Sequence, residues 1–271
     1  MQVAQGRAAG ADEIAVALKG YACSGLEPFT LEELKSLGPV SVLMNRLLFP
    51  EELKQAEDAL HALSGLEIPH IYFADPGLVS LAEQAGLKDR LIYRPETLLT
   101  SGRDADWWAH RGIASVSISP LLTREELLSF CSGCEVTAYG RLLMSASRRK
   151  LLSAYEHAAG LEMPLAGSRT LSIREAKRKE RMPIIEDESG TLIYTDYVLE
   201  SFRFVSDLSA QGAARFFMDS VLSSFEGACS AMQAYRRILA GADAEAERDA
   251  WLQAFPEIAA STGYYEEKTI Q

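Results

Sequence analysis

The amino-acid sequence predicts an α/β protein built on parallel strands, and three observations lead to that fold class. From the start to about residue 155, short apolar, β-branched runs alternate with longer amphipathic stretches, as they do where crossover helices join parallel strands. The length of 271 residues suits one large α/β barrel or two ordinary domains. With 48% apolar and 24% charged residues, the composition is that of a folded globular protein and excludes intrinsic disorder.

Strand candidates and helix starts account for this first part of the chain in order. The chain begins in a predicted helix, Gln2 to Ala9. Pro50 opens another helix with two glutamates in its first turn, and Thr123 to Glu126 has the form of a capping box. The strand candidates are Glu13 to Leu18, Val40 to Met44, Pro69 to Ala74, Leu91 to Arg94, Ala114 to Ile118 and Glu135 to Tyr139.

The pattern changes after residue 160. Two apolar runs, Met182 to Ile185 and Thr191 to Tyr194, flank a polar turn that ends in Gly190, which predicts a hairpin. Two helices are expected next, over Ala210 to Met218 and Ser220 to Leu239, separated by a short strand or turn. The remainder is rich in Ala, Asp and Glu, and we expect it to end as a frayed extension after residue 263.

Charge and hydropathy narrow the possible partners and the compartment. The net charge of −11 disfavours general binding to nucleic acid or membranes. No apolar run reaches the length of a membrane-spanning helix, and the start lacks the pattern of a secretory signal, so we expect a cytoplasmic protein without membrane contact. Between Arg141 and Arg181, however, ten Lys or Arg stand against four Glu, so this segment carries +6 and the remainder −17.

Polar residues at the ends of the strand candidates are the first candidates for a functional site. In a parallel α/β barrel the carboxyl ends of the strands form the functional mouth, which singles out Asn45, Asp75 and the stretch from Glu135 to Arg141. Glu135 with Arg141 is a local acid/base pair: Glu135 is either a general base or the partner of an arginine. Asn45 and Asp75 either contact a substrate or cap the helices that follow.

The four cysteines and a run of basic residues raise two further hypotheses, a metal site and a binding surface for RNA or acidic partners. Cys131 and Cys134 have the spacing of a metal-binding pair, but Cys23 and Cys229 would have to complete the site without any local spacing in support. We therefore predict no cofactor, with an iron–sulfur cluster as the alternative. The run Arg174 to Arg181 either contacts RNA phosphates or acidic partners, or forms a solvated surface cluster.

Several stretches, in matching order and spacing, resemble the collagenase-like peptidases of peptidase family U-32. Glu135 to Arg148 is similar to the most diagnostic signature of that family, a strand E-V-F-V-H/Y-G-R-L-P-L-M followed by S-R-x-C. The resemblance covers nearly the whole chain to about Leu239. The other matching stretches are Gly10 to Asp12, Val42 to Asn45 with Glu51 to Leu53, Phe73 to Leu78, Trp107 to Ser119 and Met182 to Gly190.

The resemblance implies a barrel of TIM type. It favours one barrel-type domain over residues 1–240, with a basic loop and hairpin inserted at 160–195, and an acidic, partly helical tail at 241–271. Family members begin with an apolar strand before the helix that leads to Gly10, whereas this chain opens in that helix. We expect either a longer form of the protein or a barrel that is incomplete at its N-terminal side, because a missing strand leaves two unpaired edges.

The resemblance also implies an activity, a peptidase acting on peptide or protein substrates. In that hypothesis Glu135 is the acid/base, Asn45 and Asp75 orient the substrate, and Tyr139, Arg141 and Arg148 bind it. Arg141 or Arg148 would hold a carboxylate or stabilise an oxyanion.

Two departures from the family motifs keep other functions open. Other members resemble iron–sulfur proteins that hydroxylate RNA or a quinone precursor. On an ungapped alignment Lys150 stands where the signature has a cysteine, and Pro120-Leu121 stands where the family has Arg-Glu. A cluster-dependent hydroxylase is therefore one alternative. The other is a non-catalytic member that pairs with a cluster-bearing relative or binds RNA.

Overall fold

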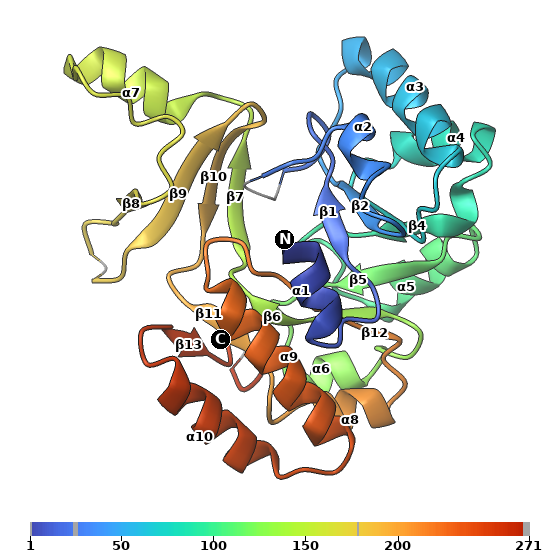
Figure 1. The fold of residues 1–271 in the computed structure, drawn as a ribbon, viewed down its shortest axis with the longest axis vertical. Helices are drawn as coiled ribbons and strands as arrows, with labels where there is room; N and C mark the ends of the chain where they lie inside the picture. The colour runs from blue at the N-terminus through green and yellow to red at the C-terminus, as the bar shows by residue number, and fades with distance from the viewer. Residues whose placement is uncertain (1, 24–26, 178, 268–271) are drawn as a thin grey trace.

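The chain folds around a curved, mainly parallel sheet. A computed structural model describes residues 2–23, 27–177 and 179–267 (Figure 1). Its strands run in chain order across the sheet, each parallel to the next, and β12 follows β6 at the far side. These strands are β1 (Ala15–Ala17), β2 (Ser41–Met44), β3 (Ile71–Phe73), β4 (Leu91–Tyr93), β5 (Ser115–Ile118), β6 (Glu135–Gly140) and β12 (Arg215–Met218). This arrangement is compatible with a TIM-type barrel.

Crossover helices cover the outside of the sheet and bury its outer face. Leu60 and Leu63 on the buried side of one such helix are fully enclosed, and so are Ile71 and Phe73 of the strand that follows. All six strand candidates are confirmed, and so is the capping box at Thr123. The helices of this half are α1 (Gln2–Ala8), α2 (Leu31–Leu34), η1 (Pro50–Glu52), α3 (Leu53–Ser64), α4 (Gly77–Gln84), η2 (Lys88–Arg90), α5 (Gly102–Ala109) and α6 (Arg124–Leu128).

The predicted helix over Ala210 to Met218 is wrong. Helix α8 (Val205–Ala210) ends where that helix was expected to begin, and the aromatic run that follows forms β12. Strand β12 pairs along β6 with Arg215 opposite Glu135. A four-residue apolar run has no periodicity that separates strand from helix, so pairing with β6 decided its conformation. The next helix, α9, spans Phe225–Leu239.

The parallel sheet is open between β1 and β12. Among the described strands, β1 pairs only with β2, and β12 pairs only with β6. At the carboxyl end of β1, Phe29 donates its amide to Ala17 O at 2.8 Å on the other edge. Side chains bridge the gap at the amino ends of the strands, where Arg215 Nη1 lies 2.8 Å from Glu13 Oε2 and its Nη2 lies 2.9 Å from His70 Nε2. His70 Nδ1 lies 2.9 Å from both Glu13 oxygens, and Ser41 donates to the same carboxylate.

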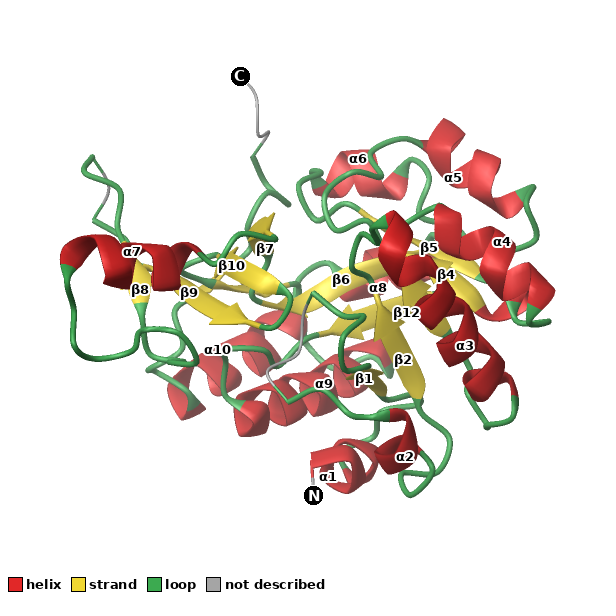
Figure 2. Cartoon of the chain, turned by 90° about the horizontal axis from the view of Figure 1, so that it is seen from above, coloured by secondary structure: helices red, strands yellow, loops and turns green. Residues whose placement is uncertain are grey.

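A second, antiparallel sheet projects from the first, as Figures 1 and 2 both show. Its strand order is β7-β10-β9-β8, and the predicted hairpin is confirmed as β9 (Met182–Asp187) and β10 (Gly190–Tyr194). The insertion therefore begins at β7 (Leu143–Ser147), earlier than residue 160, because β7 pairs with β10. Gly190 has φ 133°, and a Cβ there would lie 1.9 Å from Ser147 O, so the turn requires glycine. Helix α7 (Leu151–Ala159) and β8 (Ser172–Ile173) complete this arm.

The C-terminal segment packs on α9 and β11 and does not fray at residue 263. Helix α10 (Ala244–Ala254) packs on α9, and β13 (Ala260–Ser261) pairs with β11 (Val198–Glu200). Tyr265 is 5% exposed, and its hydroxyl donates to Thr137 O at 2.9 Å. None of the helices in the described ranges is both long and apolar enough to cross a bilayer.

The contacts of Glu13 with Arg215 and His70 across the open edge should make the stability of the fold depend on pH. Burial alone would raise the pKa of Glu13, but hydrogen bonds from His70 and Ser41 and the charges of His70 and Arg215 outweigh it and hold the pKa at about 2. The ionised carboxylate therefore stabilises the fold above about pH 4.5, and this contribution disappears as the pH falls toward 2. We expect Glu13→Gln to lower the free energy of unfolding at pH 7 by about 2 kcal/mol, measured by urea denaturation.

The difference between wild type and Glu13→Gln should shrink as the pH is lowered from 5 to 2. Glu32→Gln is the control, because Glu32 forms only an exposed pair with Lys35. A difference that stays constant between pH 7 and pH 2 would contradict this account.

Candidate functional site

A buried arginine organises the interior of the parallel sheet. Arg94 directly follows β4 and is 7% exposed. Its Nη1 donates to Ser117 Oγ at 2.9 Å and to Glu135 Oε1 at 3.1 Å, and its Nη2 donates to Thr137 Oγ1 at 3.4 Å. The guanidinium also lies over the ring of Phe217, 3.8 Å from its centroid. One side chain therefore connects β4, β5, β6 and β12.

Glu135 is the buried partner of this arginine. It is 1% exposed and accepts a second hydrogen bond from the Tyr72 hydroxyl at 2.9 Å. Burial raises the pKa of Glu135, and the charge of Arg94 and the bond from Tyr72 offset only part of that effect. A carboxyl group of this kind holds its proton to higher pH than an exposed one, which suits a general acid.

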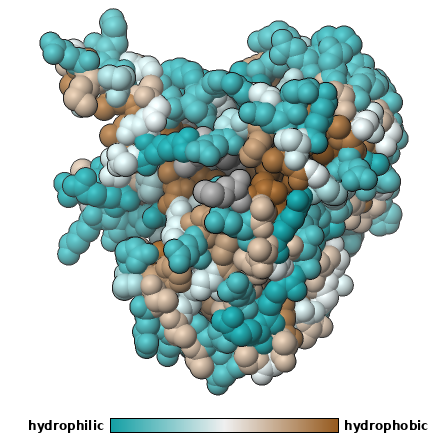
Figure 3. All heavy atoms as spheres, in the orientation of Figure 1, coloured by the Kyte–Doolittle hydropathy of each residue, from teal (hydrophilic) through white to brown (hydrophobic). Residues whose placement is uncertain are grey.

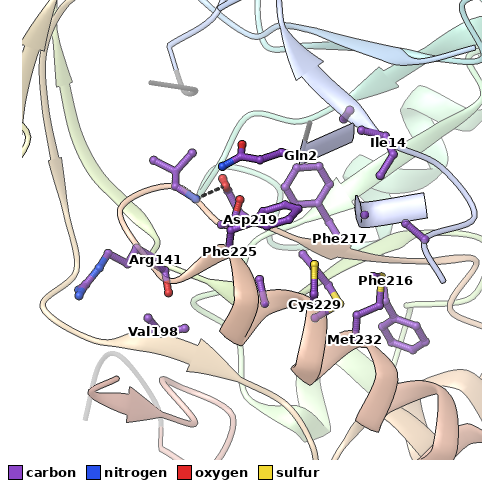
Figure 4. Close-up of a pocket in the computed structure, with 18 of the residues that line it drawn as sticks. Gln2, Ile14, Arg141, Val198, Phe216, Phe217, Asp219, Phe225, Cys229 and Met232 are labelled. Carbon is purple, nitrogen blue, oxygen red and sulfur yellow. Dashed lines mark hydrogen bonds between the residues drawn. The ribbon is translucent and has the colours of Figure 1, made fainter. Parts of the chain in front are cut away.

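Two further carboxyl groups face the same guanidinium. Glu96 Oε1 lies 3.7 Å from Arg94 Nε, and Asp219 follows the end of β12. Burial raises the pKa of Asp219, although its Oδ1 accepts a 2.8 Å hydrogen bond from the Val221 amide. Asp219 and Glu135 both line a cavity of about 1530 Å³, into which Asp219 points in Figure 4. The site is therefore rich in acid, with three carboxyl groups around one cation.

Asn45, which directly follows β2, belongs to this network. Its Nδ2 donates to Glu96 Oε1 at 3.1 Å, and its Oδ1 accepts from the Cys23 amide at 3.2 Å. Asn45 and Glu135 are thus joined through Glu96 and Arg94. Sequence reasoning missed Arg94, Glu96, Tyr72 and Asp219. Arg94 could have been found from the sequence, because it is a charged residue at the end of an apolar strand.

The other predicted site residues lie outside the network. Asp75 accepts from the amides of Leu48 and Gly77, each at 2.8 Å, so it organises the loop before α4. Tyr139 is fully buried against Trp251 on the α10 side of β6, with ring centroids 5.8 Å apart. Tyr139 stands four positions after Glu135, so regular alternation would place both side chains on the same face of β6. The register shift against Phe217 and Met218 adds one residue to β6 between Thr137 and Tyr139, and this turns Tyr139 away from the interior.

The two predicted arginines have other partners. Arg141 lines the cavity, but it donates to the carbonyls of Leu222 and Thr195 at 2.8 and 2.7 Å. It is not the ion-pair partner of Glu135, a role that Arg94 takes. Arg148 makes two 3.0 Å bonds to Glu52 and ties the projecting arm to the loop after β2.

The four cysteines do not fit a four-thiolate cluster. Cys23 lies beside Asn45 at the carboxyl ends of the strands, and Cys131 and Cys134 precede the start of β6. Cys229 lies on α9. Burial raises the pKa of all four thiols, to about 12 for Cys23 and about 11 for Cys134, which disfavours the thiolate that binds metal. Across the described ranges, no three His, Cys, Asp or Glu side chains are grouped to hold a metal ion.

Comparison with known proteins identifies relatives of this chain. A family model described as peptidase family U32 matches residues 2–271. The tRNA hydroxylation protein P2 of Bacillus subtilis (strain 168) is 21% identical over 248 residues, which cover 85% of this chain and 80% of that protein. The solved structure of the U32 peptidase Mk0906 aligns with a TM-score of 0.43 and 15% identity, over 78% of this chain and 86% of the other.

Two buried tyrosines allow a matched test of the interior network. The Tyr72 hydroxyl donates to Glu135, whereas the Tyr194 hydroxyl is buried and has no hydrogen-bond partner among the described residues. We expect Tyr72→Phe to lower the free energy of unfolding by about 1.5–3 kcal/mol, because it leaves the buried Oε2 of Glu135 without its donor. Tyr194→Phe should change it by less than about 0.5 kcal/mol, since no bond is lost. Equal losses in chemical denaturation would contradict the network as described.

Proposed function

The chain belongs to peptidase family U32, and from that premise we propose that it serves RNA hydroxylation as a subunit that binds the RNA. The oxidative chemistry would come from a second, cluster-bearing family member with which it forms a hetero-oligomer. A relative that aligns over 80% of its own length is named for tRNA hydroxylation, which supports this substrate class. The placement of the cysteines supports the division of labour, since Cys23, Cys229 and the pair Cys131 and Cys134 lie on separate elements and no group that could hold a metal ion occurs among the described residues.

The basic connection between β8 and β9 is the observation that carries the proposal. Its four described cations, Arg174, Lys177, Lys179 and Arg181, are all exposed. Among the described residues, none of these four cations forms an ion pair within 4.0 Å. Arg178 is outside the described residues. Cations without protein partners are available to phosphates, and their contacts release counterions from RNA.

The position of this connection also supports RNA binding. It belongs to the arm that projects from the acidic body in both views of the fold (Figures 1 and 2). Charges are screened over about 10 Å at 0.1 M salt. An arm held away from the acidic body therefore presents its own positive charge to a polyanion. Arg149, exposed after β7, adds to the same arm. The net charge of −11 therefore does not describe the surface that an RNA would meet.

Neutralising this connection should weaken RNA binding. We expect Arg174→Ala, Lys177→Ala and Arg181→Ala combined to reduce the affinity for a folded tRNA and to lower the slope of log Kobs against log salt by about two to three. Filter binding or fluorescence anisotropy across a salt series measures both quantities.

The matched control removes three exposed cations from the opposite part of the molecule, Lys35, Lys54 and Arg103, which changes net charge equally. Equal effects of the two triple variants would mean that only net charge matters. A salt slope unchanged by the arm variant would remove the RNA-binding role.

Peptide-bond hydrolysis is a second candidate, favoured by two carboxyl groups with raised pKa in one cavity. Glu135 and Asp219 both line the 1530 Å³ cavity, and two carboxyl groups with separate environments can divide general acid and general base roles. If so, purified protein should cleave gelatin or a labelled peptide, and Glu135→Gln should lower kcat by about 100-fold or more. Glu51→Gln, on the exposed start of η1, is the control. Absence of cleavage, or activity that survives Glu135→Gln, would remove this candidate.

A further inference from the structure

A second, small cavity lies where the projecting arm meets the network around Arg94. Its volume is about 20 Å³, which is enough for one ligand of the size of a water molecule. Polar side chains from both parts of the molecule line it: Arg94, Glu96, Thr137 and Asp219 from the body, and Tyr194 from β10 of the arm. We call this space the Tyr194 cavity.

The hydroxyl of Tyr194 is a buried polar group without a partner at this cavity. The side chain is 1% exposed, and its hydroxyl has no hydrogen-bond partner among the described residues. Burial and the nearby charges of Asp219 and Glu96 raise the pKa of Tyr194, so the phenol keeps its proton close to these two carboxyl groups. Buried polar groups in proteins are normally hydrogen-bonded, and this hydroxyl therefore indicates a ligand.

The surroundings of this hydroxyl are apolar. The Tyr194 ring packs with Ile185 and Leu192 of the arm, and Leu143 and Leu222 pack against this cluster. Brown, hydrophobic side chains gather at the middle of the face drawn in Figure 3, between the arm and the body. Hydrogen bonds and charge interactions are stronger in such low-dielectric surroundings than in water, so an uncompensated charge there is costly.

Carboxyl groups outnumber the cations that face this cavity. Arg94 is already paired with Glu135 at 3.1 Å and lies 3.7 Å from Glu96. Burial raises the pKa of Asp219, and the charge of Arg94 opposes this effect only in part. Arg141 also lines the cavity, but its guanidinium donates to two backbone carbonyls and points away from Asp219 in Figure 4. A second cation beside Asp219 would balance the charge.

Backbone strain at the same place supports a ligand site. Glu96 and Leu222 have φ angles of 57° and 54°, in the region that residues with side chains rarely adopt. In the described part of the chain, they are the non-glycine residues with positive φ. Glu96 lines the cavity, and Leu222 packs against the cluster that contains Tyr194. Such conformations are concentrated at ligand and active sites, where the surrounding structure enforces them.

We propose that the Tyr194 cavity binds one ammonium group, either as the free ion or as the head of a primary amine. Its N–H groups donate to the hydroxyl oxygen of Tyr194 and to the carboxylates of Asp219 and Glu96, and its charge offsets their excess negative charge. A water molecule has the same size but adds no charge. A metal ion fits less well, because within the described ranges no three His, Cys, Asp or Glu side chains are placed to hold one.

The test compares the thermal unfolding of the full chain in ammonium chloride, potassium chloride and sodium chloride at equal ionic strength and pH 7. We expect ammonium to raise Tm in a saturable way by about 3 °C or more relative to sodium. The concentration dependence of Tm gives the apparent Kd. Potassium has no N–H groups to donate, so its affinity should be about tenfold weaker than that of ammonium, or worse.

Matched variants locate the effect at this cavity. Tyr194→Phe removes one oxygen atom and should weaken the apparent affinity for ammonium about tenfold or more, while its Tm in sodium chloride stays close to that of the wild type. Asp219→Asn should weaken it as well. Tyr155→Phe, exposed on α7, and Asp89→Asn, exposed in η2, are the controls and should respond to ammonium as the wild type does. Circular dichroism verifies folding, and Tyr194→Phe keeps the test decisive if Asp219→Asn does not fold.

A larger amine distinguishes the two sources of the ammonium group. Weaker binding of butylammonium than of ammonium assigns the cavity to the free ion, whereas equal or tighter binding assigns it to the head of an amine whose chain leaves the cavity. The proposal is overturned if ammonium and sodium chloride give the same Tm, or if potassium matches ammonium. It is also overturned if Tyr194→Phe responds to ammonium as the wild type does.

Discussion

The buried ion pair between Arg94 and Glu135 is the interaction on which the interior of this protein depends. Arg94 contacts groups on β5 and β6 and covers Phe217 of β12, while Glu135 receives the hydroxyl of Tyr72 from β3. Removing Arg94 would leave the buried Glu135 carboxyl group without its cation, which is far costlier than losing a surface pair. The pair therefore ties β4 to β6 and, through the Tyr72 hydroxyl, to β3.

Carboxyl groups outnumber the cation in this network. Glu135 and Glu96 pair with Arg94, Asp219 interacts electrostatically with the same cation, and burial raises the pKa of Glu135 and Asp219. A carboxyl group with a raised pKa keeps its proton to a higher pH than an exposed one. Such a group attracts cationic or proton-donating ligands rather than anions. On the function proposed above, RNA would be bound on the projecting arm, away from these carboxyl groups.

The fold separates these parts physically. The projecting antiparallel arm carries the exposed cations of the β8–β9 connection, and the parallel sheet encloses the acidic network.

The sequence by itself determined the parallel α/β architecture, the hairpin and the strand-end position of Asn45, because each is written in local periodicity and turn chemistry. Glu135 lies at the amino end of β6, not at the carboxyl-end mouth where the sequence pattern predicts it. It did not reveal that Arg94, 41 positions away, is the partner of Glu135. Nor did it distinguish β12 from a helix, since the run from Arg215 to Met218 is too short for periodicity and became a strand by pairing with β6. Those features depend on which strands lie side by side, and only the tertiary structure decides that.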